Sequence, residues 1–148
     1  MCPASDSPEP DARLLSAAEA VQTGRFGDAV ALYEQLLTDA PQDPTLLRAH
    51  AAVSVLVRAE NIDRSTDPIG RSDAAPQHVA KALDAADVLV LFDQPADAVD
   101  RLSALVESLP KDDVAPVRQR ILELLTLVEP QDPAVERARR RLANATFQ

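Results

Sequence analysis

The sequence predicts an all-α protein of about seven helices, in which helical hairpins repeat about every 34 residues. Two stretches carry this prediction, Thr23–Pro41 and Phe92–Pro110, which align at an offset of 69 residues and share the tripeptide Asp-Ala-Val. Prolines at positions 41, 76 and 110 stand 35 and 34 residues apart, so each interval is about half of that offset. Aromatic residues make up only 3% of the chain and glycine occurs three times, which favours helices packed through Ala, Leu and Val over a β-sandwich.

Each of the two stretches places a small residue one helical turn before a bulky one. Ala29 precedes Tyr33 by four positions, and Ala98 precedes Leu102 by the same interval. Residues four apart lie on one face of a helix, so the alanine allows the two helices of a hairpin to approach closely while the larger side chain fills the space beside it. The proline that ends each stretch cannot continue a helix interior and helps set where the next hairpin begins.

The chain is expected to contain a linker or disordered tail over residues 1–10 and one helical repeat domain over residues 11–148. The first ten residues include three prolines and two serines, a linker composition. In the second part, apolar periodicity and capping signals predict helices over residues 11–23, 27–39, 45–60, 78–91, 95–108, 114–128 and 133–146.

Capping residues and helix breakers set the boundaries in the first half. Gly24 supplies a left-handed cap after the first helix, and the second helix follows directly. Asp43 caps the third helix, with Pro44 in its first position. Where the repeat calls for the next helix, Pro68 and Gly70 interrupt the pattern, so we expect a loop with at most one or two helical turns there.

The second half contains one ambiguous segment. Residues 88–92, Val-Leu-Val-Leu-Phe, have the composition of a buried strand, but the repeat register and the alanines before them favour the end of a helix. Residues 95–108 then repeat the Ala-x3-bulky pattern, and residues 114–128 carry an amphipathic apolar stripe. Asp132 caps the last helix, with Pro133 in its first position.

The charge and the cysteine content limit the possible partners. The net charge of −9 argues against nucleic acid, whose phosphates require a basic surface. The sequence has no apolar run long enough to span a membrane and no secretion signal at its start, so a cytoplasmic location is expected. Cys2 is the single cysteine, which excludes an intrachain disulfide and a C-x-x-C redox pair.

No pattern in the sequence indicates catalysis. His50 and His78 are the only histidines, and no Cys or His cluster has the spacing of metal ligands. Ser54 follows His50 by four residues, but no third group orients the pair, and no phosphate-binding glycine loop is present. We therefore expect no enzyme activity, no metal and no cofactor.

The 34-residue hairpin with Ala-x3-Tyr and a closing proline resembles the tetratricopeptide repeat over residues 11–110. The segment Ile121–Phe147, with its leucine-rich helix, Pro-Gln-Asp-Pro turn and arginine-rich helix ending in Phe, resembles the C-terminal end of bacterial thioredoxin–tetratricopeptide fusion co-chaperones, the chaperedoxin family. The tail at residues 2–10 corresponds to the linker between the two parts of those proteins. The resemblance covers only their repeat half, because this chain contains neither a thioredoxin domain nor its C-x-x-C motif.

This resemblance implies hairpins stacked in a right-handed superhelix that binds unfolded client or chaperone polypeptides. An alternative from another class is a structural scaffold or oligomerisation domain, for instance a homodimer, with no client binding of its own. The first-helix positions Leu14 and Ala18 do not match the Lys and Asn with which eukaryotic repeats clamp a C-terminal carboxylate. That mode of recognition is therefore not expected.

Two sets of residues are candidate binding surfaces. The first helix of each repeat lines the concave face in this class, which gives a largely apolar groove suited to an apolar or amphipathic peptide. Its candidate residues are Leu14, Ala18, Val21, Val53, Leu56, Val57, Leu83, Asp87, Val90 and Leu91. The same residues would be ordinary core if the C-terminal helices or a second copy filled the groove. The second set is a basic end, expected to form a polar cap or to dock an acidic partner, made of Arg137, Arg139, Arg140 and Arg141.

Overall fold

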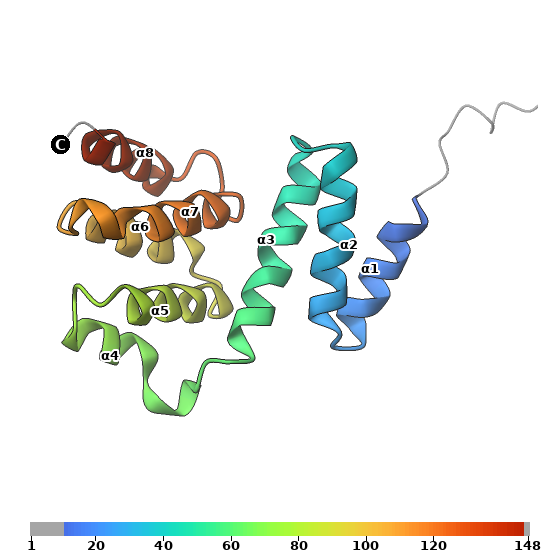
Figure 1. Cartoon of the computed structure of the whole chain (residues 1–148), viewed down its shortest axis with the longest axis horizontal. Coiled ribbons are helices and arrows are strands. Elements are labelled where there is room, and N and C mark those ends of the chain that lie inside the picture. The colour runs from blue at the N-terminus through green and yellow to red at the C-terminus, as the bar shows by residue number, and fades with distance from the viewer. Residues whose placement is uncertain (1–10, 147–148) are drawn as a thin grey trace, which may run out of the picture. The chain divides into compact units, whose positions relative to one another are not determined.

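The computed structural model describes residues 11–146, which form eight α-helices and two short 3-10 helices without any strand in that range (Figure 1). The prediction of an all-helical protein is therefore confirmed, whereas the linker predicted at residues 1–10 lies outside the described residues. The chain forms two compact units, Met1–Ser54 and Val55–Gln148, which are described separately. No helix among residues 11–146 is long and apolar enough to cross a membrane.

The first unit contains a hairpin of α1 (Ala12–Gln22) and α2 (Phe26–Asp39). At the start of α1, Asp11 accepts a hydrogen bond from the backbone amide of Arg13 at 2.9 Å. Gly24 follows α1 with a φ of 79°, the left-handed conformation expected of a glycine cap. The chain can therefore reverse within a few residues and pack α2 against α1.

Small residues form the contact inside this hairpin. Ala20 and Ala29 are buried, and they pack with Val53 of the third helix while Tyr33 lies half-buried against them. As predicted, Ala29 lies at the contact between the helices and Tyr33, four residues later, packs beside it. The third helix, α3 (Pro44–Ala59), begins as predicted, because the Asp43 carboxylate accepts hydrogen bonds from the backbone amides of its first turn.

The second unit contains the last turn of α3 and all the helices after it. These are the 3-10 helix η2 (Arg64–Thr66), α4 (Pro68–Ala74), α5 (Val79–Leu91), α6 (Pro95–Val106), the 3-10 helix η3 (Lys111–Asp113), α7 (Val114–Leu125) and α8 (Pro133–Thr146). Along the chain, α4 packs on α5, α5 on α6, and α6 on both α7 and α8 (Figure 1). Residues 88–91 belong to α5, so the choice of helix over strand is confirmed.

Helix α4 makes eight α-helices where seven were predicted. The expected loop with one or two helical turns is a helix of seven residues, because Pro68 stands in its first position, where a proline is tolerated. Asp67 caps this helix by accepting from the amide of Gly70 at 3.2 Å. A Cβ at Gly70 would collide with the Asp67 carboxylate, which explains the glycine. Helices α6 and α7 also end earlier than predicted, at Val106 and Leu125.

The core of the second unit lies where α5, α6, α7 and α8 meet. Ala98 and Leu102 of α6 are fully buried, in agreement with the roles predicted for them, and so are Ile121 and Leu124 of α7. Asp132 starts α8 as predicted by accepting from the amide of Ala134 at 2.9 Å. One apolar cluster therefore holds these four helices together and fixes the side chains that they carry.

Candidate functional site

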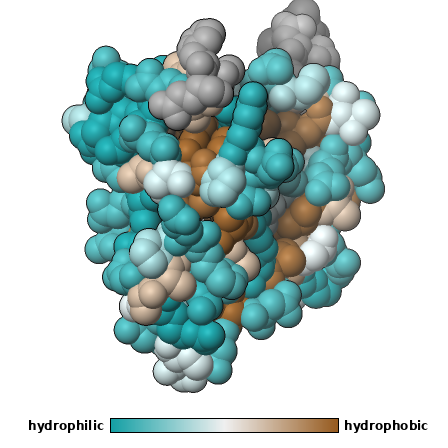
Figure 2. All heavy atoms as spheres, turned by 60° about the vertical axis from the view of Figure 1, so that its left-hand side comes forward, coloured by the Kyte–Doolittle hydropathy of each residue, from teal (hydrophilic) through white to brown (hydrophobic). Residues whose placement is uncertain are grey.

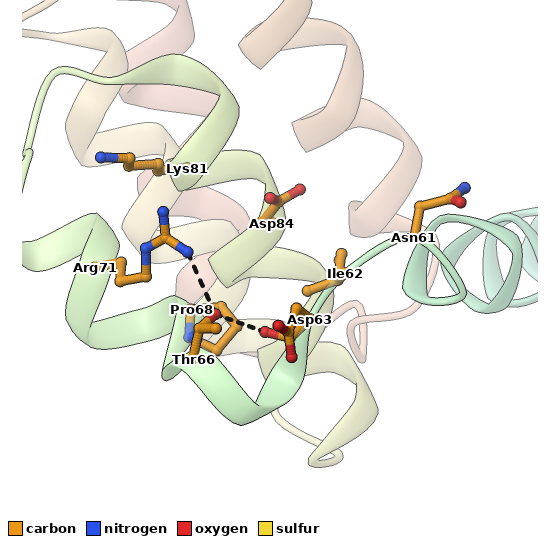
Figure 3. A pocket seen from close by; sticks show the side chains of 8 residues that line it. All are labelled: Asn61, Ile62, Asp63, Thr66, Pro68, Arg71, Lys81 and Asp84. Carbon is orange, nitrogen blue, oxygen red and sulfur yellow. Dashed lines mark hydrogen bonds between the residues drawn. The ribbon is translucent and has the colours of Figure 1, made fainter.

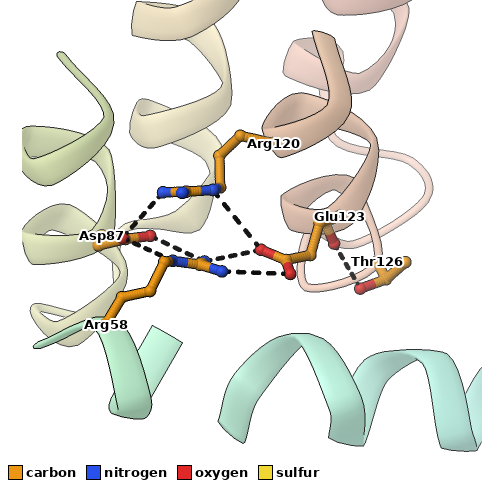
Figure 4. A network of polar contacts seen from close by, with 5 residues as sticks. All are labelled: Arg58, Asp87, Arg120, Glu123 and Thr126. Atoms are coloured by element: carbon orange, nitrogen blue, oxygen red, sulfur yellow. Dashed lines mark hydrogen bonds and ion pairs between the residues drawn. The ribbon is translucent and has the colours of Figure 1, made fainter. Parts of the chain in front are cut away.

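Four charged side chains from three helices form a closed ion-pair network in the second unit (Figure 4). Asp87 of α5 accepts from Nε and Nη2 of Arg58 at 2.8 and 3.0 Å, and from Nη1 of Arg120 at 2.9 Å. Arg58, at the end of α3, also donates to both carboxylate oxygens of Glu123, at 3.3 and 2.7 Å. Arg120 and Glu123 lie one turn apart on α7, with Nε 3.9 Å from Oε2. The network therefore joins the end of α3 to α5 and α7.

The pKa values of the two arginines are shifted in opposite directions, because burial and hydrogen bonding balance differently for each. Burial alone would lower the pKa of Arg58, but its hydrogen bonds to Asp87 and Glu123 outweigh burial and raise the pKa. Burial dominates for Arg120, whose pKa is lowered in spite of Asp87. Both guanidinium groups remain protonated at neutral pH, because arginine ordinarily titrates above about 12. The network thus has two positive and two negative charges.

This network determines what the candidate groove residue Asp87 can do. Its side chain is 1% exposed and both of its carboxylate oxygens are engaged by arginine, so Asp87 holds the helices together and is not accessible to a ligand in this structure. The sequence contains a hint of this role, because Asp87 is the one charge among the apolar candidate positions. A lone charge on an apolar helix face requires a partner of opposite charge.

The candidate groove residues of the first unit differ widely in exposure. Leu14 is 39% exposed and Ala18 is also exposed, while Val21 is half-buried and Val53 is only 5% exposed. Val21 and Val53 pack in the same small cluster with Ala20 and Ala29. Of the candidate groove residues in this unit, therefore, Leu14 and Ala18 are the exposed ones.

The candidate groove residues of the second unit are half-buried, with the exception of Asp87. Leu56 and Val57 belong to the last turns of α3. Leu83, Val90 and Leu91 of α5 pack against the core cluster shared with α6 and α7. Each of these side chains combines a core contact with some remaining accessible surface.

The four arginines of the predicted basic end fall into two pairs. Arg137 donates to both carboxylate oxygens of Asp100, at 2.9 and 2.6 Å. Arg141 donates to Ser103 at 2.9 Å and lies 3.2 Å from Glu107. These two therefore attach α8 to α6, and hydrogen bonding from Arg137 holds the pKa of Asp100 below its ordinary value.

The other two arginines, Arg139 and Arg140, are exposed and form no ion pair within residues 11–146. Position 139 falls on the side of the helix opposite 137 and 141, whereas position 140 lies at the edge of the face that carries 137, and both side chains are exposed. Only this pair has the exposure expected of a polar cap or a docking surface.

Replacing the two arginines of each pair with glutamine should separate these roles. Arg137→Gln with Arg141→Gln is expected to lower the melting temperature measurably, since it removes the bonds from α8 to Asp100, Ser103 and Glu107. The matched variant, Arg139→Gln with Arg140→Gln, should melt as the unchanged chain does, and helical circular dichroism measures both. Equal melting temperatures for the two variants would contradict the conclusion that only Arg137 and Arg141 attach α8 to α6.

The same contact should depend on pH in a defined direction. Because the pKa of Asp100 is lower in the folded chain than in the unfolded one, its contribution is present above about pH 4 and is lost as the pH falls further. The Arg137/Arg141 variant should therefore lose less stability on acidification than the unchanged chain.

Three large apolar side chains outside the predicted groove are also exposed. Leu15 of α1 is 65% exposed, Phe92 at the end of α5 is 63% exposed, and Leu122 of α7 is 54% exposed. These residues were not among the predicted binding residues, because the repeat register was used to identify only the positions that face the expected groove. Leu15 lies next to Leu14, so α1 presents two leucines to solvent.

A polar pocket of about 250 Å³ lies between η2, α4 and α5 (Figure 3). Two acids, Asp63 and Asp84, and two bases, Arg71 and Lys81, line it. Arg71 donates to the hydroxyl of Thr66 at 3.3 Å. The formal charges of the lining therefore balance, and they do not point to an anion or to a cation as its ligand.

A larger pocket, of about 390 Å³, lies where α6, η3, α7 and α8 meet, and we call it the α6–α8 pocket. Its apolar lining is Val106, Leu109, Val114, Ala115 and Ala145. Lys111 and Arg118 complete the lining, and no acidic side chain within residues 11–146 contributes to it. Figure 2 shows hydrophobic atoms exposed between hydrophilic ones on the face of the molecule that is turned forward there.

The described residues contain no arrangement typical of a metal centre. Among residues 11–146, no group of three or more His, Cys, Asp or Glu side chains could hold a metal ion. His50 instead lies 3.3 Å from Glu34, and His78 caps α5 by accepting from the amide of Lys81. The surfaces described above are therefore the candidates for function.

Hairpins of antiparallel helices with small residues at their contacts define this chain as a helical-repeat protein. Residues 69–147 match the tetratricopeptide repeat family, and the chain belongs to that family. Tetratricopeptide domains serve as protein-interaction modules. The match includes α5 to α8, and so contains the α6–α8 pocket and three of the four residues of the ion-pair network.

The chain is also similar to uncharacterized proteins of Mycobacterium bovis and of two strains of Mycobacterium tuberculosis. Each is 32% identical to it over 142 residues, which cover 96% of this chain and 46% of the relative. The chain therefore spans about half the length of the curated relatives it matches. No solved structure matches it significantly.

Proposed function

We propose that this chain is the interaction module of a cytoplasmic co-chaperone of the thioredoxin family and binds unfolded client or chaperone polypeptides. The observation that carries the proposal is the tetratricopeptide match over residues 69–147, because the family consists of protein-binding repeats. Exposed leucines on α1 add support, since clients present apolar segments that such side chains can bind.

The thioredoxin part of the proposal rests on resemblance. The segment Ile121–Phe147 resembles the C-terminal end of thioredoxin–tetratricopeptide fusions, and more than half of each mycobacterial relative lies outside the match. We expect the genomic reading frame to encode a C-x-x-C motif in a thioredoxin-like domain before residue 1. A reading frame without one would refute the fusion and leave the interaction module untouched.

The client-binding part is tested by aggregation of a denatured enzyme, with citrate synthase as the client. The chain is expected to suppress light scattering at equimolar ratio. Leu14→Asp should weaken this effect, because it places a carboxylate in the candidate groove. The fold should survive, since Leu14 lies in the first turn of α1, where the helix dipole favours an acid.

Leu15→Asp is the matched control, because Leu15 is the neighbouring exposed leucine and is not a groove position. Equal loss in both variants would show that α1 binds clients through its apolar surface in general and would refute the groove register. Within the second unit, Leu56→Asp tests the groove at a half-buried position. Loss of client binding with the fold retained would support the groove, whereas unfolding of the variant would show that Leu56 is a core residue.

The alternative function is a scaffold or oligomerisation domain that binds no client. It predicts a stable dimer or larger assembly by light scattering coupled to gel filtration, with no suppression of client aggregation. The proposed function predicts suppression by the chain whatever its mass in solution. If the chain forms an assembly and does not suppress the aggregation of the client, the scaffold function is supported and client binding is refuted.

A further inference from the structure

We propose that the α6–α8 pocket binds an acidic segment of a partner polypeptide through one large apolar side chain. This inference rests on the proposed function, because it takes the ligand to be a polypeptide. It concerns a different surface from the candidate groove, since none of the groove residues lines this pocket.

The floor of the pocket determines that the ligand has an apolar anchor. Val106 and Val114 are almost fully buried, with 2% and 8% of their surface exposed, and both belong to the core cluster of the unit. A side chain that enters the pocket therefore contacts fixed core residues and removes their remaining apolar surface from water. The volume of about 390 Å³ lies within the usual range of about 300–1,000 Å³ for ligand pockets.

The rim determines the charge of the ligand. Lys111 of η3 is exposed and has no ion-pair partner within residues 11–146, and Arg118 of α7 contributes a second cation. The neighbouring acids Asp112 and Asp113 are exposed and do not line the pocket. Among the described lining residues, a segment with Asp or Glu on either side of its anchor would therefore face two cationic side chains and no acidic one, which favours it over a neutral or basic segment.

The local charge differs from that of the rest of the chain. Residues 111–148 hold 6 acidic and 7 basic side chains, while the whole chain has a net charge of −9. An acidic ligand is thus repelled by most of the molecule and attracted at this end. The charge distribution should steer such a segment toward the pocket and away from the remaining surface.

Fluorescence anisotropy with synthetic peptides tests the proposal directly. The probe is a fluorescein-labelled peptide of Glu and Ser with one central Phe, and two matched peptides replace either Phe with Gly or every Glu with Lys. We expect the acidic Phe peptide to bind, with at least tenfold weaker binding for each of the other two. Binding should also weaken as salt is added.

Ala115→Glu is the decisive protein variant. Ala115 lines the pocket and is exposed in the first turn of α7, where an acid is favourable to the helix, so the fold should be retained while a carboxylate enters the pocket. We expect about tenfold weaker peptide binding, and a similar loss in Lys111→Glu. Ala12→Glu is the matched control, because Ala12 is an exposed alanine in the first turn of α1.

Three outcomes would overturn the proposal. The first is that the acidic Phe peptide does not bind, and the second is that it binds equally to the Ala115→Glu and Ala12→Glu variants. The third is that the chain self-associates and Ala115→Glu abolishes this self-association, which would make a second copy of the chain the occupant of the pocket. Suppression of client aggregation that persists in Ala115→Glu, alongside any of these results, would refute the pocket alone and leave the proposed function standing.

Discussion

Replacing Asp87 with alanine is expected to lower the free energy of unfolding of the second unit by about 3 kcal/mol. The substitution removes the carboxylate that accepts three hydrogen bonds from Arg58 and Arg120, and leaves two arginines with Glu123 as their only partner in the network. Removal of one member of a buried ion pair costs about 3–5 kcal/mol. We expect the lower end, because the side chains of Arg58 and Arg120 are 26% and 17% exposed and can still be hydrated in part.

Urea denaturation followed by helical circular dichroism measures this change. Asp84→Ala is the matched control, because Asp84 lies on the same helix three residues earlier, is exposed and takes no part in the network. Its effect should stay within about 0.5 kcal/mol. If the two variants unfold at the same urea concentration, the network contributes nothing to the stability of the unit.

The shortening of Leu102 to alanine is expected to cost about 3 kcal/mol, within the range of 2–5 kcal/mol for buried leucines. Leu102 has no exposed surface and lies in the cluster formed by α5, α6, α7 and α8, so the substitution removes buried methyl groups and leaves a cavity among elements that cannot all close over it. The same experiment also tests the repeat pattern, because Leu102 follows Ala98 by one helical turn.

Leu122→Ala provides the matched comparison, since it makes the same chemical change at a leucine that is 54% exposed. Its cost should be below about 1 kcal/mol, because the removed atoms are largely hydrated in the folded chain. Denaturation curves of the two variants are compared directly. Similar midpoints would contradict the assignment of Leu102 to the core.

The features that the sequence could predict are those set by residues near one another in the chain. Asp43 and Asp132 cap their helices, Gly24 adopts the left-handed conformation, and Ala29 and Ala98 are buried at helix contacts. Each depends on a spacing of four residues or fewer, which periodicity and capping reveal directly. The one or two helical turns expected around residues 67–75 are helix α4, but they were not counted as a helix because Pro68 was interpreted as a breaker, although a proline in the first position begins a helix.

The candidate surfaces depended on contacts between residues far apart in the chain. Arg58 contacts residues 29 and 65 positions further on, and Arg120 returns to Asp87 across 33 positions. Whether a charged side chain meets such a partner depends on the rotation of each helix about its axis and on its packing. For the same reason the four arginines of α8 were predicted as one group, whereas the packing of α8 on α6 engages Arg137 and Arg141 and leaves Arg139 and Arg140 in solvent. The sequence by itself determined the helices and their caps, because those depend on local geometry. Only the tertiary structure decided which charges are buried and where an apolar pocket stays accessible, because both depend on how separate helices meet.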